Sequence, residues 1–514
     1  MSTAGKLFRN GLMLALAALC VQTAAMGFNV WLSGKIGAEG MGLFSLISAA
    51  YRFAMTFSLS GIGLAATRLA AEEFARGSGR GALLATVKCA VYALCFSLAA
   101  CFTLFVSSDF VSVRFLHDAR SAPSLRMLAL ALPPLSVSAA FDGYFTAKRS
   151  VKVTAASLLA EQFLRMGVTV ALVELVMPPD IEHACTAVSV GITVSEAASF
   201  VFVAFSCLFD RRRTLRESTE KPSPGQTKRL LAIAVPIAIS SYLRSGISTF
   251  REVLIPSGLK KHGGSYEQAL ASYGVIKGMT LPLIRFPAAF LDAFSGLLMP
   301  EMARYYQLNQ RVSIRHAAER VLRVTLLFSI GTSAMLTGFS YDLGALFYRD
   351  NAAAVGRTLL LIGPCVFVMY LDTAVDSMLK GLNEQLANVR YNLMDSSLCL
   401  ALVALFVPRF GIGAYLFVIV FSEFFNTTLS LRRLKKVTGL HLDFKRLLLM
   451  PGACAVLAVF VSRLPAFLTH TQTQPPLSAI LSLSAGVLLY LVLLRLTRTV
   501  GAEDIATAKD VLKN

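Results

Sequence analysis

Arginine and carboxylate side chains recur inside stretches of the sequence that are otherwise apolar enough to cross a membrane. The segment SYLRSGISTFREVLIPSG, from Ser241 to Gly258, carries Arg244 and Arg251 seven residues apart. Seven residues bring a helix back to almost the same side, so both arginines share a polar stripe with nearby serines. Because the planar guanidinium binds phosphate with two parallel hydrogen bonds, this spacing indicates an anion-binding helix face.

Three further cations lie in two other apolar stretches. Arg52 shares a helix face with two serines and a threonine, and Lys277 and Arg285 lie on either side of Pro282. An arginine at the membrane centre costs at least about 2.5–3.5 kcal/mol, so such residues normally face protein or a water-filled cavity. We therefore predict a cationic, substrate-binding cavity where two halves of the chain meet, lined by Arg52, Arg244, Arg251, Lys277 and Arg285.

Simpler explanations for some of these charges stay open. Arg251 and Lys277 could extend to the membrane interface, and Arg285 could pair with Asp292 on the same helix. Arg251 and its neighbour Glu252 point about 100° apart, so they do not neutralise each other face to face.

Carboxylates in the second half of the chain are the candidates for ion coupling. They are Asp372, Asp376, Asp395 and Glu423. Asp372 and Asp376 are four residues apart on one helix face, where they could bind Na⁺ or H⁺. Pairing with loop arginines such as Arg390 is the alternative. In the first half, Glu161, Arg165, Glu174 and Glu196 are expected to form interhelical pairs without an assigned role.

The sequence around these charges is that of a polytopic membrane protein. Of the 514 residues, 55% are hydrophobic and 15% are charged, and the mean hydropathy is +0.63. About fourteen stretches reach the roughly 20 residues that a helix needs to cross the hydrocarbon layer. The predicted spans are 10–33, 41–66, 82–108, 125–147, 153–177, 184–208, 230–255, 270–299, 318–347, 357–381, 386–408, 411–431, 447–464 and 476–494.

The distribution of basic residues predicts the topology. The net charge is +19, and most of the 49 Lys and Arg residues fall at the N-terminus, in alternate loops and in the C-terminal tail. The positive-inside rule then places both termini in the cytoplasm. The basic excess is thereby explained without nucleic acid, and it adds some attraction to anionic membrane lipids.

A basic linker divides the chain, and a weak internal repeat relates its two halves. We predict an N-terminal six-helix lobe at 1–209, a basic cytoplasmic linker at 210–229, a C-terminal six-helix lobe at 230–435, and two extra helices with a cytoplasmic tail at 436–514. PLSVSAAFD places Asp142 eight residues after Pro134, and PCVFVMYLD places Asp372 eight residues after Pro364. This recurrence predicts an all-α fold of two parallel-repeat lobes in a V shape.

Two motifs make a family recognisable. GKIGAEGMGLFSL, before the second span, and YGVIKGMTLPLIRFPAAFLDAFSGLLMPEMARYY, through the eighth, occur here. They resemble the stage V sporulation protein B and polysaccharide-transporter branch of the multidrug/oligosaccharidyl-lipid/polysaccharide exporter superfamily, to which lipid II flippases belong. The resemblance covers roughly residues 1 to 435. Lipid II flippases carry arginines in their first span, where this chain has Gln22, Thr23 and Asn29.

The resemblance implies a flippase for a lipid-linked glycan or peptidoglycan precursor, with a polyprenyl pyrophosphate bound among the cations. The expected role is in cell-wall, spore-cortex or polysaccharide synthesis at the bacterial inner membrane, with membrane lipids and cell-wall synthesis proteins as partners. The alternatives are a multidrug exporter of the same superfamily and a non-transporting membrane scaffold.

An enzyme is not expected, since the sequence lacks His-Glu-x-x-His, phosphate-loop and nucleophile-elbow motifs. We expect no catalytic residue and no metal. We also expect no cofactor other than a coupling Na⁺ or H⁺.

Overall fold

The chain folds into long helices joined by short connections. The computed structural model describes residues 3–175, 180–216, 218–308, 310–440, 445–468, 475–497 and 499, and it contains no strand among them. Predictions for the C-terminal tail beyond residue 499 lie outside these described residues. Helices suit this composition because every backbone N–H and C=O within lipid must find its partner inside the same segment.

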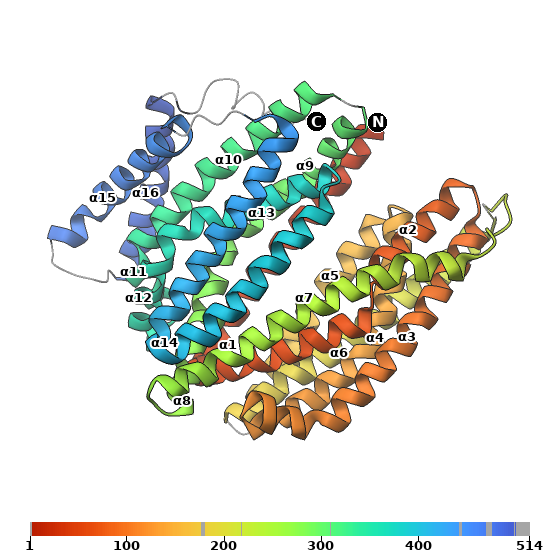
Figure 1. The fold of residues 1–514 in the computed structure, drawn as a ribbon, viewed down its shortest axis with the longest axis horizontal. Helices are drawn as coiled ribbons and strands as arrows, with labels where there is room; N and C mark the ends of the chain where they lie inside the picture. The colour runs from red at the N-terminus through yellow and green to blue at the C-terminus, as the bar shows by residue number, and fades with distance from the viewer. Residues whose placement is uncertain are drawn as a thin grey trace. The chain divides into compact units, whose positions relative to one another are not determined.

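The α-helices follow one another along the chain, as Figure 1 shows. Their bounds are α1 Thr3–Leu59, α2 Ile62–Ala75, α3 Gly79–Phe110, α4 Ala122–Ala147, α5 Val151–Leu175, α6 Ile181–Arg216, α7 Gln226–His262, α8 Tyr266–Gly274, α9 Leu281–Gln307, α10 Arg311–Gly338, α11 Ser340–Phe347, α12 Ala352–Ile362, α13 Val366–Gly381, α14 Gln385–Thr438, α15 Met450–Leu468 and α16 Pro476–Leu496. Short π-helical turns lie at η1 Val111–Leu116, η3 Val275–Thr280 and η6 Lys445–Leu449, and 3₁₀ turns lie at η2 Ala119–Ser121, η4 Arg349–Asn351 and η5 Gly363–Cys365.

Twelve helical segments in the described part of the chain are long and apolar enough to cross a membrane. Two of them, Leu16–Ala75 and Gln385–Thr438, contain 60 and 54 residues. At 1.5 Å per residue each is about 80–90 Å long, which is more than twice the thickness of the hydrocarbon layer. The predicted all-α polytopic fold is therefore confirmed, and the predicted count of fourteen spans is compatible with two double-length segments.

Each double-length segment contains a break at a glycine. Gly37 has φ 66° and ψ −171°, and Gly411 has φ 63° and ψ −142°, both outside the helical range. A positive φ is costly for residues that carry a Cβ atom, so glycine is the residue expected at such a break. The two breaks fall where the sequence predicts a gap between spans, near 33–41 and 408–411.

Contacts divide the chain into two compact units. Unit A comprises Thr23–Phe28 and Glu39–Ser257, and unit B comprises Met1–Gln22, Asn29–Ala38 and Gly258–Asn514. These bounds differ from those of the predicted lobes, because most of α7 packs within unit A. Within unit B, the segment Asn29–Ala38 contacts the later part of the chain through the Tyr348 hydroxyl, which donates to Oδ1 of Asn29 at 2.9 Å.

Small residues allow the helices of unit A to approach closely. A Cβ atom added at Gly143 of α4 would lie 2.7 Å from the Ala66 side chain and 2.9 Å from the Thr67 backbone on α2. Membrane helices use such small residues because close backbone approach maximises van der Waals contact where lipid offers no hydrophobic driving force. The core here includes Ile62 and Leu69.

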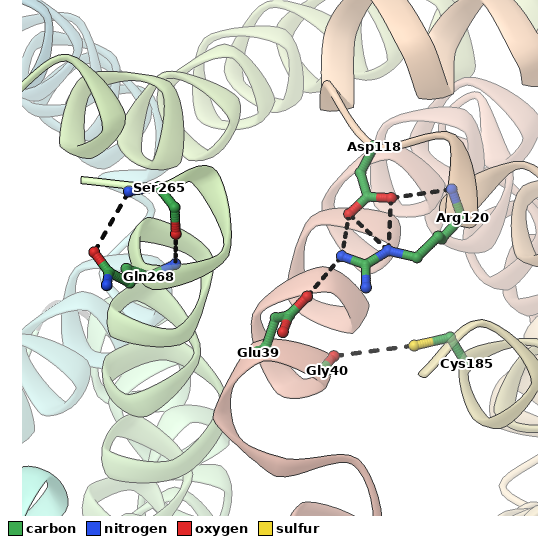
Figure 2. A network of polar contacts seen from close by, with 7 residues as sticks. All are labelled: Glu39, Gly40, Asp118, Arg120, Cys185, Ser265 and Gln268. Atoms are coloured by element: carbon green, nitrogen blue, oxygen red, sulfur yellow. Dashed lines mark hydrogen bonds and ion pairs between the residues drawn. The ribbon is translucent and has the colours of Figure 1, made fainter. Parts of the chain in front are cut away.

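A charged network fixes the start of the second part of α1 in unit A. Figure 2 shows Arg120 between two carboxylates: its Nη2 lies 2.7 Å from Oδ2 of Asp118 and 2.7 Å from Oε1 of Glu39. Glu39 follows the Gly37 break by two residues. The network therefore ties the chain after the break to the connection between α3 and α4.

Helices α15 and α16 pack beside each other and against α10 in unit B (Figure 1). Nη2 of Arg463 on α15 lies 2.8 Å from Oδ2 of the buried Asp342 on α11. A short helix also begins in this unit at a capping box, in which the Ser265 hydroxyl accepts from the Gln268 N–H and the Gln268 side chain accepts from the Ser265 N–H (Figure 2).

Candidate functional site

The polar stripe of α7 packs against α1 within unit A. Thr56 of α1 donates to the Ser245 hydroxyl at 3.1 Å, and the hydroxyls of Ser60 and Tyr242 lie 2.7 Å apart. These contacts align the stripe with the second part of α1. Part of the predicted polar face of α7 therefore forms hydrogen bonds with other residues of the protein.

Arg52 of α1 forms an ion pair with Glu252 of α7, a pairing that was not predicted from the sequence. Its Nη2 donates to Oε2 of Glu252 at 2.7 Å. The Glu252 side chain is 7% exposed and the Arg52 side chain is 47% exposed, so the carboxylate is the buried member. No pattern in the sequence predicts this pair, because its members are 200 residues apart and lie on different helices.

Two arginines of the predicted site lie on α7 and have no partner in the part of the chain that the structure describes. Arg244 is exposed and Arg251 is half-buried. Neither makes a hydrogen bond or an ion pair with any residue that the structure describes. Because guanidinium groups in membrane helices are normally paired, these two can accept an anionic ligand.

The remaining predicted cations, Lys277 and Arg285, lie in unit B. Lys277 is half-buried in the π-helical turn η3, where the Thr280 hydroxyl donates to the Val275 carbonyl five residues earlier at 2.9 Å. Such turns occur often at functional sites. Arg285 is exposed on α9, the helix that also carries Asp292.

The predicted coupling carboxylates belong to a polar cluster in unit B. Asp372 of α13 accepts from Nδ2 of Asn426 at 2.9 and 3.1 Å and from the Thr427 hydroxyl at 3.3 Å. Asp395 accepts from the Ser422 hydroxyl at 2.9 Å. Asp372 on α13 thus contacts the part of α14 after the Gly411 break, and Asp395, in the part of α14 before the break, contacts the same later part. The donors in these hydrogen bonds are neutral side chains.

The other two predicted acids lie on the same helices. Asp376 accepts from the Ser430 hydroxyl at 3.5 Å, and Glu423 is half-buried on α14. Among the described residues, no group of three or more His, Cys, Asp or Glu side chains could hold a metal ion.

An apolar groove lies between α9, α10 and α16 in unit B. Its volume is about 760 Å³. The wall includes Phe286 and Phe290 of α9, Phe328 of α10, and Val487 and Leu491 of α16. A groove of this size and character can hold an alkyl or isoprenoid chain.

Comparison with known proteins connects these features to a family. The family model described as "Polysaccharide biosynthesis protein" matches residues 7–288, which is more than half of the chain. The chain belongs to the polysaccharide biosynthesis protein family. Stage V sporulation protein B of Bacillus subtilis (strain 168) is 21% identical to this family member over 508 residues, with 97% of each chain covered.

Solved transporter structures share the fold. An inward-facing multidrug resistance transporter of the MATE family, in the MOP superfamily, matches with a TM-score of 0.64 and 14% identity, covering 83% of this chain and 99% of that one. The lipid II flippase MurJ, in an inward closed conformation, matches with a TM-score of 0.62 and 12% identity, covering 94% and 98%. The resemblance predicted from the two sequence motifs is confirmed, and the matched proteins are transporters and a flippase rather than enzymes.

Proposed function

We propose that this chain is a flippase that moves a glycan or peptidoglycan precursor on a polyprenyl pyrophosphate from the inner to the outer leaflet of the bacterial cytoplasmic membrane. Both termini would lie in the cytoplasm, and the cargo would be used in cell-wall, spore-cortex or polysaccharide synthesis. The observation that carries the proposal is the pair Arg244 and Arg251, two arginines of a membrane-length helix that have no partner among the residues that the structure describes.

The chemistry of the cargo follows from this pair. An arginine within the membrane that lacks a partner costs at least about 2.5–3.5 kcal/mol, and a ligand that carries phosphate recovers that cost. A pyrophosphate offers two negatively charged groups for bidentate hydrogen bonding. Arg52 belongs to the same proposed site, but the Glu252 carboxylate balances its charge. We therefore expect the loss of Arg52 to weaken cargo binding less than the loss of Arg244.

Lys277 and Arg285 are proposed to contribute to cargo binding from unit B. Both lie on the helical stretch formed by η3 and α9. The apolar groove between α9, α10 and α16 offers the isoprenoid tail an uncharged surface in the same unit.

Ion coupling is proposed for the polar cluster of α13 and α14, at Asp372, Asp376, Asp395 and Glu423. Carboxylate, amide and hydroxyl oxygens are ligands that hard cations prefer. Binding of Na⁺ or H⁺ at these acids would bias an alternating-access cycle through the energy of the ion gradient.

The test is a flipping assay with purified protein in liposomes. The probe is a fluorescent polyprenyl-pyrophosphate sugar, and its binding and its movement between leaflets are measured separately. We expect Arg244→Ala and Arg251→Ala each to weaken binding at least tenfold, the equivalent of about 1.4 kcal/mol for a lost charge-assisted hydrogen bond.

Arg114→Ala is the matched control, because Arg114 is an exposed arginine of unit A outside the proposed site. Retention of normal binding by both α7 variants would refute the anion site. Failure of the wild type to bind or move the probe would refute the flippase function and favour multidrug export or a scaffold role. Transport of a cationic aromatic dye would then distinguish an exporter, which moves the dye, from a scaffold, which does not.

A further inference from the structure

A cluster of buried and half-buried charges lies inside unit A, where the sequence predicted only interhelical pairs. Nη2 of Arg165 on α5 lies 2.5 Å from Oε1 of Glu161 and 3.9 Å from Oε1 of Glu196 on α6. Asp142 of α4 interacts electrostatically with both glutamates. The interhelical pairing is thus present between α5 and α6, but the cluster holds more acids than its arginine can balance.

Several buried polar atoms around this cluster have no hydrogen-bond partner. Tyr51 of α1 is 8% exposed, and its hydroxyl is one of them. The same side chain lies within electrostatic reach of Glu196, Arg165 and Glu161. Oδ1 of Asp142 and Nε of Arg165 are likewise buried and without a partner among the described residues. Because buried polar atoms are nearly always satisfied, the unpartnered carboxylate oxygen of Asp142 points to a bound species that donates to it.

The charge balance indicates what that species is. Three carboxylates and one guanidinium leave an excess of two negative charges among helices of membrane length. Such an excess is unfavourable away from water and is relieved when a carboxylate takes up a proton or binds a cation. Arg165 already contacts two of the acids, and no described group of acids is arranged to hold a metal ion. The proton is therefore the better match.

The internal repeat provides an independent reason to regard the cluster as a site. Asp142, Arg165 and Glu196 each lie 230 residues before Asp372, Asp395 and Asn426, the residues of the polar cluster in unit B. The two clusters occupy equivalent places in the two repeats. Their chemistry differs, because an arginine and a glutamate in unit A stand where unit B has an aspartate and an asparagine.

We propose that Asp142, Glu161 and Glu196 form a proton-binding site inside unit A, with Arg165 as a hydrogen-bond donor to it. The groups that face the site are Tyr51 from α1, Asp142 from α4, Glu161 and Arg165 from α5, and Glu196 from α6. Each proton taken up from water converts one carboxylate into a carboxylic acid. Proton binding does not depend on the proposed flippase function, whereas use of that proton to drive transport does.

The test is infrared difference spectroscopy of the full-length protein in lipid nanodiscs, titrated from about pH 5 to about pH 9 without cargo. The wild type is expected to lose a carboxylic acid carbonyl band as the pH rises across this range. Glu196→Gln and Asp142→Asn are each expected to reduce the amplitude of this band, because each removes one of the acids that can take up a proton in unit A. Glu174→Gln, at an exposed acid of α5, is the control and is expected to keep the full amplitude.

The titration of the wild type tests the proposal even where a variant does not fold. Absence of a titrating acid band in the wild type overturns it, as does equal amplitude in Glu196→Gln, Asp142→Asn and the wild type. Loss of the band on addition of NaCl at constant pH would assign a metal cation instead. Since no cargo is present, a normal titration with an inactive flipping assay would refute only the flippase function.

Discussion

The network around Arg120 makes a directional prediction about stability. Arg120 contacts Asp118 through Nε at 3.0 and 3.2 Å and through Nη2 at 2.7 Å, and it contacts Glu39 at 2.7 Å. The side chain of Asp118 is 6% exposed, whereas that of Glu39 is 27% exposed. Removal of the arginine therefore deprives a buried carboxylate of its cation, and removal of the Glu39 charge does not.

The expected magnitudes follow from burial. Breaking a buried ion pair costs about 3–5 kcal/mol, and Arg120 is 34% exposed while Asp118 keeps its hydrogen bond from the Arg120 N–H. We therefore expect Arg120→Ala to lower the apparent free energy of unfolding by about 2–3 kcal/mol. Glu39→Gln should cost less than about 1 kcal/mol, as partly exposed ion pairs do. Arg120→Lys should fall between them, because lysine keeps the charge but not the bidentate geometry.

The assay is equilibrium unfolding in mixed detergent micelles, with the wild type and the three variants measured under the same conditions. Hydrogen exchange at the start of the second part of α1 gives a local readout, because the network holds Glu39 to the α3–α4 connection. Equal destabilisation by Arg120→Ala and Glu39→Gln would refute the reasoning. A larger destabilisation by Glu39→Gln than by Arg120→Ala would refute it as well, because burial of the carboxylate would then not determine the loss of unfolding free energy.

Three further predictions concern unit B. Gly411→Ala should lower the free energy of unfolding by about 1–2 kcal/mol or more, because φ is 63° and the new Cβ would lie 2.5 Å from the His262 ring. Thermal unfolding measures this change. Gly413→Ala is the control and should show a much smaller change, because its new Cβ would have no neighbour within 4 Å. Arg463→Met removes the ion pair between α15 and α11 and should speed hydrogen exchange in α15, whereas the exposed Arg495→Met should not. If the proposed coupling is correct, Asp372→Asn should abolish the dependence of flipping on an imposed Na⁺ or pH gradient, and an unchanged dependence would exclude this acid.

Composition and the positions of the apolar stretches determined the fold class and the approximate position of most spans. Long apolar stretches can satisfy their backbone only as helices, so their existence follows from local sequence. Glycines at the two breaks, Gly37 and Gly411, were consistent with gaps between spans, although their positive φ values are visible only in the structure. The family could also be recognised, because two motifs are local in sequence.

The pairing of charges was decided by tertiary structure. Periodicity placed Arg52, Arg244 and Arg251 on polar helix faces. It could not show that Glu252 pairs with Arg52, or that Arg244 and Arg251 lack a partner among the described residues. The acids around Arg165 were likewise visible as single residues, and only the packing of three helices, α4, α5 and α6, brought them into one cluster. The physical reason is that a helix period fixes the direction of a side chain, whereas its partner depends on which distant helix lies opposite.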